Sequence, residues 1–529
     1  MPESFRELLN QDFSPLGRAV TSWRRLGEAC RTAHDTSTAR VSAPLEEAGW
    51  EGEAARSGLH AMRVTRSMLL TAQRNVLLIA GVMHHARVGM QAAQERLRNT
   101  VAEAEEAGHR VTPSGTVEPR ATSPAYRNLP DEDMALRDAE EVAAFRDRIA
   151  AALQEAHDAS GEAWRALREI DWFTLDKEYG AQSVEEAGER ITGDIGIGFG
   201  ESDIPTGESA ERAAAWWSHL NAVDRELLLA AHPLEIGALD GLPAHIRDQA
   251  NRAALTAQLD EYRLNERSLG IHDEIIHSGL TRLQSTLDAR ADAPEAERLY
   301  LLGFGTGQDG RAIVAEGNPD TAAHTAVMVP GTGNDLHNFP SLLNRSSAMR
   351  AAAEDQERGS VAVISWLGYD APELSDSVLT RERAEDGAAD LRDLTAGLRA
   401  AYEKESGHLT VIGHSYGSTT VGAADGSGRG LGADDVIVVG SPGLTVDRAD
   451  DLHVSPDHLW VGAAEDDLVS NHLSGLTLGA APQEPAFGAR TMPVDTSGHS
   501  GYWTGGSQSL ENMGRIIAGD RPLNEVREP

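Results

Sequence analysis

The sequence LTVIGHSYG, residues 409–417, has the pattern of a strand, a sharp turn and the start of a helix. It opens with an apolar run, LTVI, and a helix-compatible stretch begins immediately after it, at Ser418. A serine between two glycines, placed between a strand and a helix, is typical of a nucleophile elbow. The glycines allow other backbone to pass close to a sharp, strained turn that presents the serine hydroxyl at the end of the sheet. The segment therefore predicts Ser415 as a nucleophile.

Short apolar runs alternate with helical stretches throughout the region after residue 290. Runs of this length are typical of buried strands, and their alternation with helices predicts a mostly parallel sheet covered by helices on both faces. In such a sheet the functional groups gather at the carboxyl ends of the strands. Besides residues 409–412, the predicted strands lie in LYLLGF, RAIVAEG, AVMVPGTG, VAVISWLGY, DVIVVGSPG and LWVGAAEDD.

A serine hydroxyl is a weak nucleophile near neutral pH, so the elbow predicts a histidine base and an orienting carboxylate elsewhere in the chain. His499 lies in the segment SGHSGY just before the final predicted helix, and Asp467 follows the predicted strand LWVG. The chain order serine, aspartate, histidine suits this kind of sheet. We therefore expect His499 as the base and Asp467 as the acid, with the adjacent Asp466 as the alternative acid.

Other histidines in this region are expected to be structural. His414 is the variable residue of the elbow, and the backbone there is expected to aim its side chain away from the serine. His453, His458 and His472 have no obvious carboxylate on a neighbouring loop. None of these histidines is therefore predicted to act as the base.

Two backbone amides are predicted to bind the oxyanion that forms during acyl transfer. One belongs to Tyr416, the residue after the nucleophile, and the other belongs to Thr332 in VPGTG, at the end of an earlier predicted strand. Gly333 is the alternative second donor, and a plain glycine-rich turn is the alternative interpretation of this segment. No metal ion or cofactor is expected, because side chains and amides suffice for this chemistry.

The first part of the chain is predicted to be helical. Apolar residues from Leu16 to Cys30 and from Leu59 to Val101 recur at helical spacing, and helices so close in sequence should pack antiparallel. The segment AGWEG between them, residues 48–52, resembles the WXG turn of the small helical hairpins exported by type VII secretion systems. The resemblance implies an export-related hairpin, and a helical docking or dimerisation module is the alternative interpretation.

The chain is long enough for two domains. Its 529 residues exceed what a single core usually holds. A third amphipathic helix is expected at about 133–170, and an acidic, glycine-rich stretch at 179–207 is typical of an interdomain connection. We therefore expect an α-helical domain, residues 1–205, and a second domain, residues 206–529, that begins with a helical segment at 207–292.

The composition excludes some partners and compartments. The formal net charge is −36, so the chain lacks the excess of basic residues that binds nucleic acid. The N-terminus has no signal-peptide pattern, and the best apolar stretch, 76–83, is far shorter than the roughly 20 residues that span a bilayer. The single cysteine, Cys30, excludes an internal disulfide framework. These features predict a cytoplasmic chain without a transmembrane segment, with secretion by a type VII-like route as the alternative.

Several segments of the second predicted domain together resemble a known family. They are WW (216–217), HPLEIGALDGLPAHIRDQANR (232–252), VPGTG (329–333), SWLGYDAP (365–372), GHSYGS (413–418), GSPG (440–443) and HSGYW (499–503). Over roughly residues 210–520 the chain is similar to an actinobacterial α/β-hydrolase family catalogued as a domain of unknown function. The resemblance implies an α/β structure with the α/β-hydrolase fold, a helical prelude and an elbow serine, and it assigns the acid to Asp467. It implies no substrate.

The sequence predicts a serine hydrolase that cleaves a carboxylic ester through an acyl-enzyme intermediate. Only a short stretch separates Gly443 from the next predicted strand, which leaves little room for a mobile lid and favours an esterase on small or lipid-like esters. Lipase, amidase and thioesterase activities are alternatives, because all of them share the triad. The second hypothesis is a type VII secretion-associated effector or interaction protein whose helical region binds a helical partner or self-associates. A catalytically inactive scaffold is the third.

Overall fold

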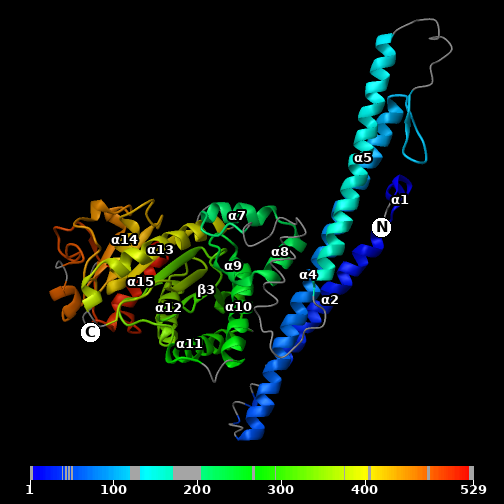
Figure 1. Cartoon of the computed structure of the whole chain (residues 1–529). Coiled ribbons are helices and arrows are strands. Elements are labelled where there is room, and N and C mark those ends of the chain that lie inside the picture. The colour runs from blue at the N-terminus through cyan, green and yellow to red at the C-terminus, as the bar shows by residue number, and fades with distance from the viewer. Residues whose placement is uncertain are drawn as a thin grey trace. The chain divides into compact units, whose positions relative to one another are not determined.

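The structure is a computed structural model of the chain, and it divides into two compact units. The helical unit comprises residues 1–204 and 221–232, and the sheet unit comprises residues 205–220 and 233–529 (Figure 1). The structure describes residues 4–37, 40–41, 44–45, 48, 52–119, 132–170, 204–264, 269–291, 293–373, 376–402, 407–473 and 477–523.

Three long helices form most of the helical unit. Its elements are α1 (Phe5–Asn10), α2 (Ser14–Ser37), α4 (Glu53–Glu106), the hairpin of β1 (Arg110–Val111) and β2 (Val117–Glu118), α5 (Glu132–Glu169) and α8 (Ala222–Ala231). Helix α4 packs against both α2 and α5 (Figure 1). The apolar stripe predicted for α4 faces the core, where Met90 and Leu97 are buried. Residues 49–51 of the predicted WXG turn lie outside the described residues.

Helix α8 packs within the helical unit, on α4. Its Leu227 lies against Gly81, whose missing side chain leaves room for the leucine. Its Asp224 accepts a hydrogen bond from Nε2 of His85 at 2.7 Å. The sequence predicts the whole segment 207–292 in the second domain, and α8 departs from that expectation.

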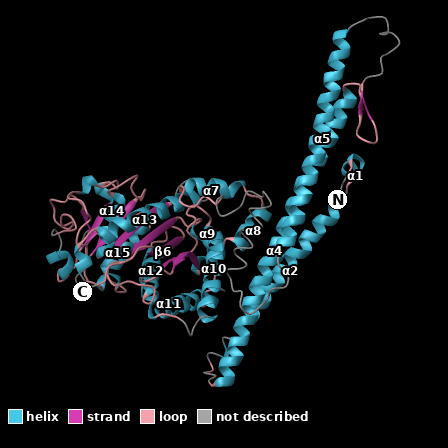
Figure 2. Cartoon of the chain, viewed as in Figure 1, coloured by secondary structure: helices cyan, strands magenta, loops and turns pink. Residues whose placement is uncertain are grey.

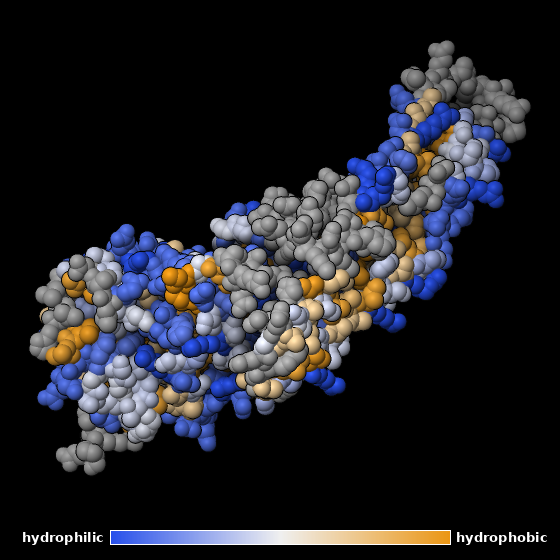
Figure 3. Space-filling view, turned by 60° about the horizontal axis from the view of Figure 1, so that its bottom comes forward, coloured by the Kyte–Doolittle hydropathy of each residue, from blue (hydrophilic) through white to orange (hydrophobic). Residues whose placement is uncertain are grey.

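The helical unit has apolar surface but no described helix that could cross a membrane. Apolar side chains are visible along it in Figure 3, and Leu26, Val88 and Trp164 are among the large apolar residues exposed there. The guanidinium carbon of Arg168 lies 4.7 Å from the ring centroid of Trp164. In the part of the chain that the structure describes, no helix combines the length and hydropathy that a bilayer requires.

An eight-stranded sheet forms the centre of the sheet unit (Figure 2). Its order is β10-β9-β8-β7-β5-β6-β4-β3, and neighbouring strands are parallel except in the two pairs made by β4. This confirms the predicted mostly parallel sheet. The strands are β3 (Leu299–Gly305), β4 (Arg311–Glu316), β5 (His324–Val329), β6 (Val361–Leu367), β7 (His408–His414), β8 (Asp435–Val439), β9 (Leu459–Gly462) and β10 (Arg490–Thr491).

Each apolar run identified in the sequence forms one of these strands, from β3 to β9. Strand β10 was not predicted, because both of its residues are exposed and carry no apolar signal. All seven residues of β6 are buried. Since successive side chains of a strand point to opposite faces, the burial of β6 means that both faces of the sheet are covered there.

Helices provide this cover in two pairs. The helices α12 (Phe339–Glu354) and α15 (Gln508–Ile517) pack together, as do α13 (Glu382–Ala401) and α14 (Tyr416–Asp425), and each pair contacts the sheet. The helical prelude contributes the rest. Its helices α9 (Pro233–Ala238), α10 (Ala244–Leu264) and α11 (Ile271–Asp288) contact β3 at the sheet edge, and α7 (Ala210–His219) contacts α13.

Candidate functional site

The elbow predicted from the sequence is a strained turn in the structure. Strand β7 ends at His414, helix α14 begins at Tyr416, and Ser415 between them has φ 54° and ψ −131°. A non-glycine residue in a sparsely populated region of this kind costs about 1–3 kcal/mol, and such strain clusters at functional sites. The side chain stands at the carboxyl end of the central strand, where Ser415 is 7% exposed.

The two glycines of the elbow lie where other backbone passes. A Cβ on Gly417 would be 2.3 Å from the carbonyl oxygen of Val329, and a Cβ on Gly413 would be 2.5 Å from the Cα of Ser418. Because hard-sphere contacts forbid such distances, neither position accepts a side chain. The turn is thus held between the end of β5 and the first turn of α14.

Asp467 and His499 form a close pair beyond the carboxyl end of β9. Nδ1 of His499 donates to Asp467, at 2.9 and 3.0 Å from the two carboxylate oxygens. The carboxylate also accepts hydrogen bonds from the Tyr502 hydroxyl at 2.6 Å and from the Val469 amide at 2.9 Å. Burial would raise the pKa of Asp467, but the hydrogen bonds from His499 and Tyr502 outweigh it and lower the pKa to about 2. Asp467 is therefore a buried anion that fixes the tautomer of His499.

Asp466 has a different partner from its neighbour. Its carboxylate accepts a hydrogen bond from the backbone amide of Gly498 at 2.7 Å. Asp467 thus contacts the imidazole of His499, whereas Asp466 contacts the backbone of the loop that carries this imidazole.

Ser415 and the pair of Asp467 and His499 meet at the end of strand β8. The Ser415 amide donates to the carbonyl of Val439 at 3.1 Å. The next residue, Gly440, has φ 60°, and a Cβ there would lie 2.9 Å from the Asp467 carboxylate and 3.1 Å from the ring of His499. The absence of a side chain at Gly440 therefore lets the imidazole approach the strand end that holds the serine.

The segment after β5 lies directly against Ser415. A Cβ on Gly331 would be 2.6 Å from the Cβ of Ser415 and 2.9 Å from the amide nitrogen of Tyr416. The Tyr369 hydroxyl holds the segment by donating to the carbonyl of Pro330 at 2.7 Å. The structure thus brings together the two segments from which the oxyanion donors were predicted.

The predicted oxyanion donors differ in their availability. The Gly333 amide donates to the carbonyl of Pro372 at 2.9 Å, so it is already engaged. No described residue accepts a hydrogen bond from the Thr332 amide. The Tyr416 amide is at the first position of α14, where a helix leaves its N–H groups without intrahelical partners. The geometry therefore leaves the amides of Thr332 and Tyr416 available for an anion.

Two side chains at this site were missed by sequence reasoning. His414 makes a contact that was not predicted: its Nε2 donates to the backbone carbonyl of His499 at 2.8 Å. Tyr502 was quoted only as part of HSGYW, yet its hydroxyl binds Asp467. A sequence signal existed for Tyr502, which lies three residues after His499 in a short turn. None existed for His414, because the direction of a side chain at the end of a strained strand depends on the turn itself.

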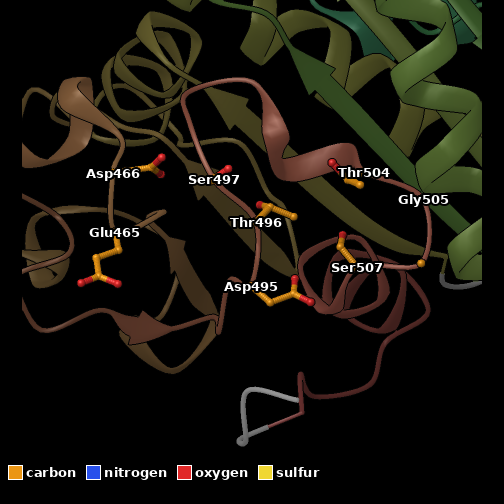
Figure 4. Close-up of a pocket in the computed structure, with 9 residues that line it drawn as sticks. Glu465, Asp466, Asp495, Thr496, Ser497, Thr504, Gly505 and Ser507 are labelled. Carbon is orange, nitrogen blue, oxygen red and sulfur yellow. The ribbon is translucent and has the colours of Figure 1, made fainter. Parts of the chain in front are cut away.

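A polar pocket of about 810 Å³ adjoins the loop that carries His499 (Figure 4). The carboxylates of Glu465, Asp466 and Asp495 line it together with hydroxyls that include those of Thr496 and Ser497. Neither Ser415 nor His499 lines it, so this pocket is separate from the elbow.

Among the described residues, one group of carboxylates has the spacing of a cation site. Atoms of Asp309, Asp370 and Glu373 lie within 4.8 Å of one another. Asp370 forms an ion pair with Arg383, and partial burial together with the neighbouring Glu373 raises the pKa of Asp309. The raised pKa of Asp309 and the ion pair of Asp370 with Arg383 explain how these carboxylates can lie close together. We therefore assign no metal to this group.

A family model and a solved structure are each similar to part of this chain. A family model described as alpha/beta hydrolase matches residues 306–477, which include Ser415 and Asp467. Among solved structures, LpqC, a poly(3-hydroxybutyrate) depolymerase from Bordetella parapertussis, aligns with 16% sequence identity and a TM-score of 0.25. The alignment covers 41% of this chain and 86% of that chain.

The curated relatives are uncharacterized mycobacterial proteins. Rv2079 of Mycobacterium tuberculosis is 33% identical over 373 residues, which are 60% of this chain and 56% of that protein, so the chain spans about half the length of this relative. Rv0963c of the same species is 31% identical over 244 residues, which are 44% of this chain and 90% of that protein. Because nearly the whole of Rv0963c is matched, and the family model covers the elbow, the chain belongs to the α/β-hydrolase family.

Proposed function

We propose that this protein is a serine hydrolase that cleaves a carboxylic ester, with Ser415 as nucleophile, His499 as base and Asp467 as acid. The observation that carries the proposal is the meeting of a strained serine and a buried carboxylate–imidazole pair at the end of β8. Nucleophile, base and orienting carboxylate in this arrangement define acyl transfer on many folds.

The reaction follows from these positions. His499 accepts the Ser415 hydroxyl proton as the serine oxygen attacks the ester carbonyl, and the Asp467 carboxylate stabilises the imidazolium that results. The amides of Thr332 and Tyr416 donate to the oxygen that becomes negative in the tetrahedral intermediate. His499 then protonates the departing alcohol. In the second half of the reaction His499 takes a proton from water, the water oxygen attacks the acyl-enzyme, and His499 returns the proton to the Ser415 oxygen as the acid leaves.

An uncharged acyl or alcohol group fits the surroundings of the site best. Leu468, next to the acid, is 69% exposed. Leu379 is 44% exposed and precedes Thr380, whose carbonyl accepts a hydrogen bond from the Tyr416 hydroxyl at 2.6 Å. The exposed leucine next to the proposed acid favours an apolar substrate, and the net charge of −36 disfavours an anionic one. The proposed substrate is therefore a small or lipid-like neutral ester.

Labelling with a fluorophosphonate probe tests the proposal. Wild-type protein should form one adduct, located at Ser415 by mass spectrometry, and the variants Ser415→Ala and His499→Ala should not react. Ser500→Ala and His458→Ala are matched controls, because both residues lie outside the proposed triad, and they should label at the wild-type rate. An unlabelled wild-type protein of native fold contradicts the proposal.

The leaving group is tested separately. A set of p-nitrophenyl ester, thioester and anilide substrates with one common acyl group should rank the ester first. Loss of Ser415 should reduce ester turnover by about a millionfold. If the thioester or the anilide reacts faster, the proposed triad stands, but the proposed substrate changes from an ester to a thioester or an amide.

A further inference from the structure

His414 connects the nucleophile to the base across a gap of 85 residues in sequence. Its backbone is joined to that of Ser415, and its Nε2 donates to the backbone carbonyl of His499 at 2.8 Å. We propose that His414 is a positioning residue, whose hydrogen bond to the His499 carbonyl sets the separation between the serine hydroxyl and the imidazole. This inference rests on the proposed function.

The loop that carries His499 needs such a support. Gly498 before it has φ 73°, and a Cβ added at this glycine would meet no atom within 4 Å, so no neighbouring group packs against the loop at that position. Asp467 holds the imidazole by Nδ1, and Asp466 holds the Gly498 amide. Both of these contacts come from the acid segment after β9. His414 supplies the contact that comes from the nucleophile's own strand.

The chemistry of His414 suits a fixed donor. The side chain is buried, with 5% of the residue exposed, and burial together with the neighbouring His499 lowers the pKa of His414 to about 3. A neutral imidazole has one N–H, and the carbonyl at Nε2 assigns the proton to that nitrogen. Nδ1 is buried and has no partner among the described residues. Among the described residues, the His499 carbonyl is thus the one hydrogen-bond partner of this side chain.

Neutral charge and rigid packing both serve the base. The ring centroid of His414 lies 4.9 Å from that of His499 and 4.8 Å from that of Trp503, and the Trp503 ring stands edge-on at 87°. The guanidinium carbon of Arg345 lies 4.7 Å from the Trp503 centroid. A second cation beside His499 would oppose the imidazolium that forms when it takes the serine proton, and a neutral ring avoids this repulsion.

Two substitutions separate the hydrogen bond from the packing. His414→Gln keeps an N–H donor at a similar reach, and His414→Phe keeps a flat ring but has no donor. His324→Phe is the matched control: Nε2 of His324 hydrogen-bonds the carbonyl of Arg358 at 3.1 Å, at the opposite end of the sheet. Each variant is compared in the full chain by its rate of fluorophosphonate labelling, by kcat and KM for an ester, and by thermal unfolding.

We expect His414→Phe to lower the labelling rate and kcat by roughly 100-fold with little change in KM, since a displacement of about 1 Å at a reacting group has that effect. His414→Gln should recover most of the loss, and His324→Phe should match the wild type. Labelling of His414→Phe at the wild-type rate overturns the proposal. Equal losses in the glutamine and phenylalanine variants also overturn it, because they assign the effect to the ring. If His414→Phe does not fold, His414→Met replaces it.

An NMR measurement tests the positioning role of His414 independently of the proposed function. The proton on Nδ1 of His499, held by Asp467, should give a strongly deshielded NMR signal without any substrate. His414→Phe should broaden or remove the signal, and His414→Gln and Ser415→Ala should retain it. If wild-type protein is not labelled, the proposed function fails, and the NMR comparison alone decides the positioning role: a signal that persists in His414→Phe overturns it.

Discussion

Two adjacent carboxylates with different partners allow a sharp test at the scale of single residues. Asp467→Asn should lower kcat by about ten-thousandfold, because the amide no longer fixes the tautomer of His499 or stabilises its imidazolium. Asp466→Asn should change kcat little, since its amide oxygen can still accept the hydrogen bond from Gly498. Steady-state kinetics on one ester measure both. Equal effects of the two substitutions would contradict the assignment of Asp467 as the acid.

Single residues could be predicted from the sequence where they belong to a local motif, but not where their role depends on the direction of a side chain. The elbow could be identified because Gly-x-Ser-x-Gly between an apolar run and a helix is a local pattern. The sequence named Asp467 with Asp466 as the alternative, because the direction of two neighbours in an irregular segment depends on backbone angles that no pattern encodes. The contact of His414 with the base loop was beyond prediction for the same reason.

At the scale of elements, the segment between β5 and α12 offers a matched pair of glycine substitutions. Gly331→Ala should slow labelling of Ser415 by roughly 100-fold, because its Cβ would press on the serine and push the segment off the elbow. Gly333→Ala has open space around the new Cβ, so it should keep labelling and lose about 1–2 kcal/mol of stability through its φ of 71°. Labelling rates and thermal unfolding of both variants check this expectation. Normal labelling of Gly331→Ala would contradict it.

The amino ends of β7 and β8 carry a pH-sensitive contact. Nε2 of His408 donates to Asp435 at 2.9 Å. Burial would lower the pKa of His408, but the hydrogen bond and charge of Asp435 outweigh it and raise the pKa above the ordinary 6.5. A raised folded pKa stabilises the protein fully below 6.5, and this stabilisation is lost as the pH rises through the folded value.

The melting temperature of wild-type protein, measured from pH 6.5 upward, should therefore fall relative to that of His408→Gln, which cannot titrate. Asp435 also contacts His458, so His458→Gln serves as the control for the second histidine on this carboxylate. Wild-type and His408→Gln curves that stay parallel over this range would contradict the prediction.

Helices and strands could be predicted where the spacing of apolar residues is regular, but the sequence did not show which elements pack against one another. Seven apolar runs became β3 to β9, and the helical spacing of the first part became α2, α4 and α5. The two exposed residues of β10 gave no signal. Helix α8 lies in the segment 207–292 that was expected to be helical, but a helical pattern does not say which core a helix joins, so its place on α4 was not predicted.

At the scale of the whole molecule, α8 makes the boundary at residue 205 an incomplete place to divide the chain. A protein of residues 205–529 retains α8 but lacks α4, so Leu227, which is 3% exposed in the full chain, would lose its cover. We expect this truncated protein to self-associate, because burying a leucine is worth about 2 kcal/mol. Leu227→Glu in the truncated protein should restore a monomer on size-exclusion chromatography with light scattering. A monomeric truncated protein without this substitution would contradict the expectation.

The position of α8 also has a consequence for the order in which a nascent chain can mature. Domains generally fold as units, N-terminal first, while the ribosome is still adding residues. Here α2, α4 and α5 can associate early, but the surface of α4 receives its last helix only after residue 232 has been synthesised. The proposed base, His499, emerges later still, after all eight strands of the sheet. A ribosome paused between residues 415 and 499 would thus carry the whole helical unit and the proposed nucleophile, Ser415, without its base.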